Sequence, residues 1–159
     1  MRFVGHLRGL WLTNTGPDGP RAAPSGAVQL RHEHRCRSCT IATAVAEEYV
    51  DAFTSRDLQR SRNVLNYPSV RLASGQVATW EKPEDYAINW DALAEVEGWH
   101  HSTLDSVEVI QAGTDKVHLA ASFSRYHADD LKYATHQALW VITLVDGHWG
   151  IQCRSSYAP

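Results

Sequence analysis

The sequence has 159 residues, of which 43% are hydrophobic and 21% charged, so one domain can bury its own core without metals or disulfides. Its net charge of −3 hides an acidic C-terminal part, which argues against nucleic acid as a partner because phosphate binding needs clustered lysine and arginine. The sequence has neither a run of about 18 apolar residues nor a signal-peptide pattern, so we expect no membrane span and a cytoplasmic protein.

The first segment, residues 1–39, is rich in glycine, proline and small residues and has no periodic apolar pattern. Such a segment buries too little apolar surface to offset its ordering entropy, so we predict a disordered tail and a domain over residues 40–159. Part of the tail reads His32-x-His34-x-Cys36-x-x-Cys39. These residue types bind zinc, but the spacing matches no standard finger, so we expect neither a metal nor a cofactor.

Three helices are predicted in the first half of the domain. The first begins at Thr40, where apolar residues recur at helical spacing. Asp57 caps a second, short helix that ends before Pro68, and a third helix runs from Pro83 to Gly98.

Extended segments make up the rest of the domain. Two short strands surround a turn between the second and third helices, and four longer strand-like runs follow the third helix. The six segments are 70–72, 77–80, 99–110, 117–127, 134–145 and 148–157. Helices followed by hairpin-connected strands predict an α+β domain, in which the helices cover one face of an antiparallel sheet.

The hairpin turns predict which side chains share a face of the sheet. A three-residue loop at 112–114 would pair His101 with Arg125, and the Asp146-Gly147 turn would pair Trp140 with Cys153. One face then gathers the candidate ligand-binding residues His101, Arg125, Gln137 and Arg154 among apolar side chains. The opposite face carries an apolar patch, for which we predict a homodimer interface; it consists of Trp140, Ile142, Trp149 and Ile151.

The two arginines of the predicted pocket favour an anionic ligand, because a guanidinium group matches the geometry of carboxylate or phosphate. The alternative is that Arg125 and Arg154 form structural ion pairs with carboxylates such as Asp105 or Asp91. His101 is the candidate general base, or else a core histidine that is hydrogen-bonded to the backbone.

Aromatic residues of the helical layer are further candidates for the roof of the pocket. Arg71, Trp80 and Trp99 lie in the same layer, but we take only Tyr67 and Trp90 as candidates, because each carries a polar group that a ligand can use. The alternative for all of these residues is core packing.

Several local motifs resemble those of a known family. They are YPSVRLASG at 67–75, GWHHS at 98–102, DKVHLAASFSRY at 115–126 and DGHWGIQCRSSYAP at 146–159. With the order of elements, they are similar to uncharacterised bacterial members of the SnoaL-like branch of the nuclear transport factor 2-like superfamily. The resemblance implies a cone in which three N-terminal helices pack on a strongly bent antiparallel sheet around a small-molecule pocket, and it also implies a homodimer.

The resemblance leaves the activity open, because the superfamily contains isomerases, cyclases, dehydratases, ligand binders and assembly domains on one scaffold. The sequence favours a domain that binds a polar or anionic small molecule and is catalytic if an acid–base group lies in the pocket. The alternatives are an enzyme of the isomerase, cyclase or dehydratase type and a non-catalytic dimerisation scaffold, which a filled cavity would favour.

Overall fold

The computed structural model describes residues 36–158, so most of the predicted tail, including His32 and His34, lies outside the described residues. Helix α1 spans Arg37–Thr54 and begins three residues before the expected start at Thr40. The Ser38 hydroxyl donates a hydrogen bond of 2.9 Å to the carbonyl oxygen of Gly113, which ties the first turn of α1 to the loop after strand β3. This long-range contact explains the earlier start.

The other helices differ from the expected ones in their bounds. Helix α2 spans Leu58–Asn63 and is capped, as expected, by Asp57, whose carboxylate accepts from the Arg60 amide. It ends well before Pro68 because strand β1 already begins at Leu65.

The third predicted helix is a 3₁₀ turn, η1 (Pro83–Asp85), and a separate helix α3 (Trp90–Glu97) that is capped by Asn89. Gly98 ends α3 in the left-handed region, at φ 69°, as expected. Helices α1 and α2 precede the first strand, and α3 lies between β2 and β3, which is the order in which the sequence analysis placed the helices and the two short strands.

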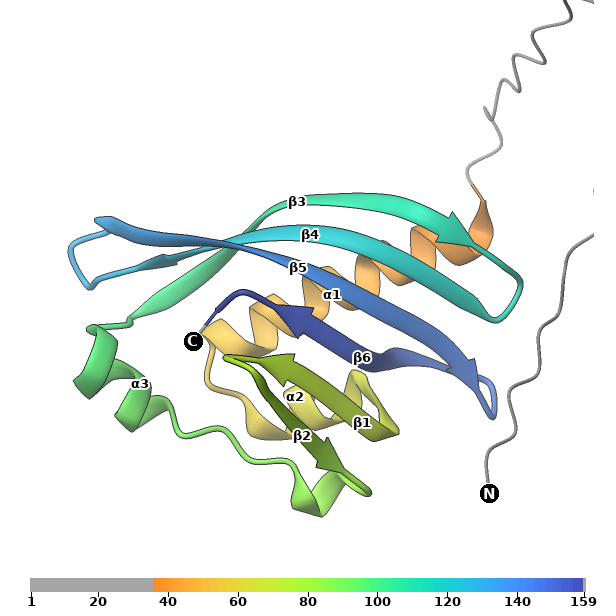
Figure 1. The fold of residues 1–159 in the computed structure, drawn as a ribbon, viewed down its shortest axis with the longest axis horizontal. Helices are drawn as coiled ribbons and strands as arrows, with labels where there is room; N and C mark the ends of the chain where they lie inside the picture. The colour runs from red at the N-terminus through yellow and green to blue at the C-terminus, as the bar shows by residue number, and fades with distance from the viewer. Residues whose placement is uncertain (1–35, 159) are drawn as a thin grey trace, which may run out of the picture. The chain divides into compact units, whose positions relative to one another are not determined.

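Six strands form one sheet in the order β2-β1-β6-β5-β4-β3 (Figure 1). They are β1 (Leu65–Ala73), β2 (Gln76–Trp80), β3 (His101–Ala112), β4 (Lys116–Tyr126), β5 (Lys132–Val145) and β6 (His148–Ser156). Strands β1 and β6 are parallel, so the sheet is mixed rather than purely antiparallel. The α+β class is confirmed.

Helix α1 lies along one face of this sheet and forms the core with it (Figure 1). Ala42 and Ala46 of α1 are fully buried, as are Leu119 and Ile142 on the sheet. The C-terminal end of α1 is tied to β3, because the Thr54 hydroxyl exchanges hydrogen bonds of 2.9 and 3.0 Å with the backbone of Ser102. The helix therefore covers the inner face along most of its own length.

The predicted pairing of β3 with β4 is wrong from the turn onward, because Ala112 pairs with Val117 and Gln111 with His118 instead of with Asp115. Two bulges in β3, between Leu104 and Ser106 and between Val109 and Gln111, recover only part of this offset. Each bulge inserts one unpaired residue and shifts the residues beyond it. His101 therefore pairs with Tyr126 and not with Arg125. Since neighbours along a strand face opposite ways, His101 lies on the face opposite to Arg125.

The β5–β6 hairpin follows the predicted register only near its turn. Val145 pairs with His148 and Ile142 with Ile151, as expected. A bulge then follows, so Trp140 pairs with Arg154 rather than with Cys153. The shift brings Arg154 onto the face that carries Trp140.

The predicted dimer interface is wrong, because its residues belong to the core. Trp140 is 3% exposed and Ile142 and Ile151 are 0% exposed, while Trp149 packs against the core cluster. The physical reason is the pairing of β4 with β5, which sets Leu119 opposite Trp140 and so places both on the inner face. The turns of the β3–β4 and β5–β6 hairpins do not determine the register of β4 against β5.

Candidate functional site

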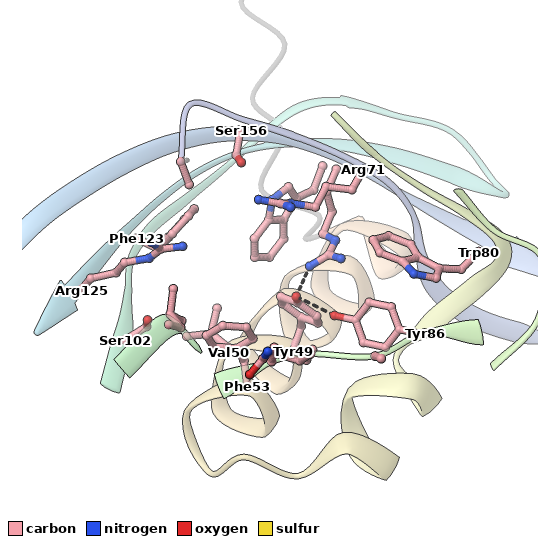
Figure 2. A pocket seen from close by; sticks show the side chains of 17 residues that line it. Tyr49, Val50, Phe53, Arg71, Trp80, Tyr86, Ser102, Phe123, Arg125 and Ser156 are labelled. Carbon is pink, nitrogen blue, oxygen red and sulfur yellow. Dashed lines mark hydrogen bonds between the residues drawn. The ribbon is translucent and has the colours of Figure 1, made fainter. Parts of the chain in front are cut away.

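A cavity of about 300 Å³ lies between the inner face of the sheet, α1 and the segment that runs from η1 into α3 (Figure 2). Its volume is at the lower end of the range of about 300 to 1,000 Å³ that is typical of small-molecule sites. Aromatic side chains from α1, β2, β4, β5 and the segment after η1 line it, and they are Tyr49, Phe53, Trp80, Tyr86, Phe123 and Trp140.

The charged residues of the wall are all arginines. Arg71, Arg125 and Arg154 line the cavity, and among its described lining residues there is no aspartate, glutamate or histidine. Arg71 lies directly opposite Arg154 on the neighbouring strand β1. The cavity therefore combines an apolar body with a cationic wall.

Arg154 is buried at one end of the cavity, where it is 8% exposed. It donates a hydrogen bond to the Tyr49 hydroxyl, and its guanidinium carbon lies 4.4 Å from the centroid of the Tyr49 ring. Tyr49 in turn shares a hydrogen bond of 3.1 Å with the hydroxyl of Tyr86 (Figure 2).

No described carboxylate lies within 4.0 Å of the Arg154 guanidinium, and its buried Nε has no hydrogen-bond partner among the described residues. Burial lowers the pKa of Arg154 to about 10, because the charged form is desolvated without a compensating anion. Arg154 is thus a buried cation whose negative counterpart is missing from the described wall of the cavity.

Arg125 lies at the other end of the cavity and has a different environment. It is 7% exposed and forms an ion pair with Glu97, the last residue of α3. The Tyr133 hydroxyl also donates to the Glu97 carboxylate, at 3.0 Å. The expected alternative of a structural ion pair therefore holds for Arg125, but with a carboxylate that the sequence analysis did not single out.

The two carboxylates proposed as partners lie elsewhere. Asp91 is 3.9 Å from Arg56 at the surface, and Asp105 accepts hydrogen bonds of 2.8 Å from Thr103 and 2.5 Å from Ser124.

Four of the six candidate ligand residues do not line the cavity. His101 stacks on Tyr126 with ring centroids 4.7 Å apart, and Gln137 is exposed on the outer face of the sheet. Tyr67 donates to the Arg62 carbonyl at 3.2 Å, and burial raises its pKa to about 12. Trp90 donates to the Phe53 carbonyl at 3.0 Å.

These placements correct the predicted pocket, since only Arg125 and Arg154 reach the cavity and they occupy separate ends of it. The turn and the bulges of β3 account for the position of His101, and the register of β5 against β4 accounts for that of Gln137. Tyr67 and Trp90 use their polar groups to bind backbone carbonyls.

Sequence reasoning also missed several residues of the wall. Tyr49 and Phe53 recur with helical spacing in α1, and this pattern indicated a buried face without distinguishing the core from a cavity. Tyr86 follows η1 in a segment with no regular period, so no sequence signal indicated its position.

The cysteine part of the proposed metal motif is described, and its cysteines are free thiols. Cys36 is exposed, and a hydrogen bond from Cys39 lowers the pKa of the Cys36 thiol to about 7. Within residues 36–158 no group of three or more histidine, cysteine, aspartate or glutamate residues is arranged to hold a metal ion. In the same range no helix is both long and apolar enough to span a membrane.

Comparisons with known proteins give matches in structure only: no protein-family model and no curated protein matches the sequence. A protein of unknown function with a cystatin-like fold from Nostoc punctiforme matches with a TM-score of 0.61 and 9% identity, over 78% of this chain and 93% of that chain. A nuclear transport factor 2-like protein from Cytophaga hutchinsonii matches with a TM-score of 0.57 and 17% identity, over 78% and 100%.

A third structure is a ketosteroid isomerase-like protein from Erwinia carotovora atroseptica. It has a TM-score of 0.56 and 19% identity, over 77% of this chain and 98% of that chain. At these identities the matches are informative about the fold alone. They show that the chain has the fold of the nuclear transport factor 2-like superfamily, as the sequence motifs implied.

Proposed function

We propose that this domain binds a small organic carboxylate in the cavity, with the carboxylate held by Arg154. The observation that carries the proposal is the buried Arg154 guanidinium, which has an unpartnered Nε and no described carboxylate within 4.0 Å. An uncompensated buried charge costs several kcal/mol, so its retention needs a compensating anion. A carboxylate supplies two acceptor oxygens that match the donors of a guanidinium group.

The aromatic wall supports an apolar or aromatic body for this ligand. Phe53, Phe123 and Trp140 line the same cavity as the two buried arginines. Such side chains bury large apolar areas and favour flat partners through edge and stacking contacts. A carboxylate attached to an aromatic or aliphatic body of modest size therefore fits both the charge and the surface of the cavity.

Binding without catalysis is favoured by the composition of the wall. An isomerase, cyclase or dehydratase needs a titratable base beside the reacting atom, and the described lining offers no aspartate, glutamate or histidine for this role. Burial raises the pKa of the Tyr86 hydroxyl, so it keeps its proton and acts as a hydrogen-bond donor.

One observation favours isomerase-type chemistry as a second candidate. Arg154 donates to Tyr49, which is hydrogen-bonded to Tyr86, and such a group of donors can stabilise an oxyanion. Two of the similar structures are described as a ketosteroid isomerase-like protein and as a "putative ketosteroid isomerase".

We also propose that the protein is cytoplasmic and forms a homodimer. Because the residues of the predicted interface belong to the core, we place the interface on the outer face of the sheet around Leu139, which is 43% exposed. The Leu139→Glu variant should then be monomeric in light scattering, and an unchanged dimer would exclude this surface.

The test of the binding function compares carboxylates with their uncharged amides. A panel of aryl and alkyl carboxylates, each matched by its primary amide, is scored by the rise in melting temperature of the wild-type protein and of Arg154→Met. We expect carboxylates alone to stabilise the wild type, because only they compensate the Arg154 charge, and we expect this preference to vanish in the variant. Arg56→Met, at an exposed arginine outside the cavity, is the matched control. Equal stabilisation by acids and amides would refute the proposal.

A further inference from the structure

We infer that the ligand carries its negative charge at one end only and presents a neutral hydrogen-bond acceptor, such as a carbonyl oxygen, to Arg125 at the other. This inference rests on the proposed function and assigns a polarity to the same cavity: the carboxylate lies at Arg154, an aromatic frame lies in the middle, and the neutral acceptor lies beside the Arg125–Glu97 pair. Three observations carry it.

The first observation is that the two buried arginines lie too far apart to hold one group. Arg125 pairs with Ala134 of β5, whereas Arg154 pairs with Trp140 of the same strand. Six residues of extended strand separate these partners, which corresponds to about 20 Å between their backbone positions. Figure 2 shows Arg125 entering the cavity from a different side than Arg71. The arginines therefore define two subsites.

The second observation is that the Arg125 end is already neutralised. The Arg125 guanidinium and the Glu97 carboxylate form an ion pair, and the Tyr133 hydroxyl donates to the same carboxylate. His136, on the neighbouring strand, has its pKa lowered by burial and by Arg125, so it adds no positive charge near neutral pH. A second carboxylate at this end would meet Glu97, which repels it.

The third observation is an unused donor at this neutral end. The Arg125 Nε is buried and has no hydrogen-bond partner among the described residues, and Arg125 lines the cavity. Leaving such a donor unpaired costs about 1–3 kcal/mol, so a ligand with an acceptor at this point is favoured over one with an apolar end. The end of the ligand that reaches Arg125 is thus polar and uncharged.

The test uses three probes on one frame: 3-(4-acetylphenyl)propanoate, 3-(4-isopropylphenyl)propanoate and 3-(4-carboxylatophenyl)propanoate. Acetyl and isopropyl groups have similar shapes, but only acetyl offers an acceptor, and the third probe adds a second charge. Titration calorimetry on the wild type should show the acetyl probe binding about tenfold more tightly than the isopropyl probe. The dicarboxylate should bind no more tightly than the acetyl probe.

Two variants separate the acceptor from the charge. The double variant Arg125→Met/Glu97→Gln removes the ion pair as a unit, so no buried charge is stranded, and it should abolish the acetyl preference while both probes still bind through Arg154. Glu97→Gln alone leaves Arg125 uncompensated and should make the dicarboxylate the tightest of the three probes.

The outcomes that overturn the inference differ from those that overturn the binding function. If the isopropyl probe binds as tightly as the acetyl probe, or the dicarboxylate binds most tightly to the wild type, the assigned polarity is wrong while carboxylate binding stands. If 3-(4-acetylphenyl)propanoate binds no more tightly than its primary amide, the proposed function fails, and the inference fails with it.

Discussion

The two ends of the cavity carry the same residue at the same burial in opposite electrostatic states. Arg125 is 7% exposed and Arg154 is 8% exposed, yet among the described residues Arg125 has the Glu97 carboxylate, whereas Arg154 has the Tyr49 hydroxyl and no carboxylate. Burial alone therefore does not indicate the role of a charged residue. A paired buried arginine holds elements together, whereas an unpaired one lowers stability until an anion arrives.

The largest effect is expected at the paired end. Arg125→Met strands the Glu97 carboxylate and should lower the free energy of unfolding by about 3 kcal/mol, the lower end of the usual cost of breaking a buried pair, because Glu97 is partly exposed. Chemical denaturation measures this loss. The double variant Arg125→Met/Glu97→Gln should recover most of it, and a double variant as unstable as the single one would show that the ion pair is not the cause.

A smaller effect is expected from the hydroxyl that contacts the unpaired arginine. Tyr49→Phe removes the acceptor of the Arg154 hydrogen bond and a partner of Tyr86, and should cost about 2 kcal/mol in denaturation experiments. Tyr67→Phe is the matched control, because its hydroxyl lies outside the cavity and donates to a backbone carbonyl; it should cost about 0.5–1 kcal/mol. Equal losses in the two variants would contradict the special position of Tyr49.

The smallest effect concerns His136 beside the paired end. Burial and then Arg125 lower its pKa below the ordinary 6.5, so as the pH falls below about 6.5 the unfolded chain binds a proton that the folded chain does not. Stability should therefore decline on acidification through this window, and His136→Gln should decline less. Melting curves between pH 7 and 5 test this, with His118→Gln on the other sheet face as control. Identical pH dependence of wild type and His136→Gln would rule it out.

The fold could be predicted from the sequence because its signals are local. Asp57, Gly98 and the Asp146-Gly147 turn each end or begin an element through the conformation of their own residues, and the structure places them as expected. The pairing near the turn, Val145 with His148, followed from the same local chemistry.

The site could not be predicted as fully because it depends on bulges and long-range pairing. The turn after β3 is offset by three residues from the predicted pairing and two bulges recover two of them, so His101 pairs with Tyr126 and not with Arg125. One extra residue in β6 turns Arg154 toward Trp140. The alternation of apolar and polar residues along a strand does not indicate where such extra residues lie. Glu97 meets Arg125 only because α3 ends beside β4, a contact over 28 residues that no spacing rule indicates.

The central claim is that Arg154 is retained for an anion, and stability measured with and without one tests it most directly. Free energies of unfolding are determined for the wild type and Arg154→Met, each alone and with 3-(4-acetylphenyl)propanoate at a hundred times its dissociation constant for the wild type. We expect the variant alone to be at least as stable as the wild type, and the probe to stabilise only the wild type, by about 2.7 kcal/mol. A variant that is less stable than the wild type, or that the probe stabilises equally, would contradict the account.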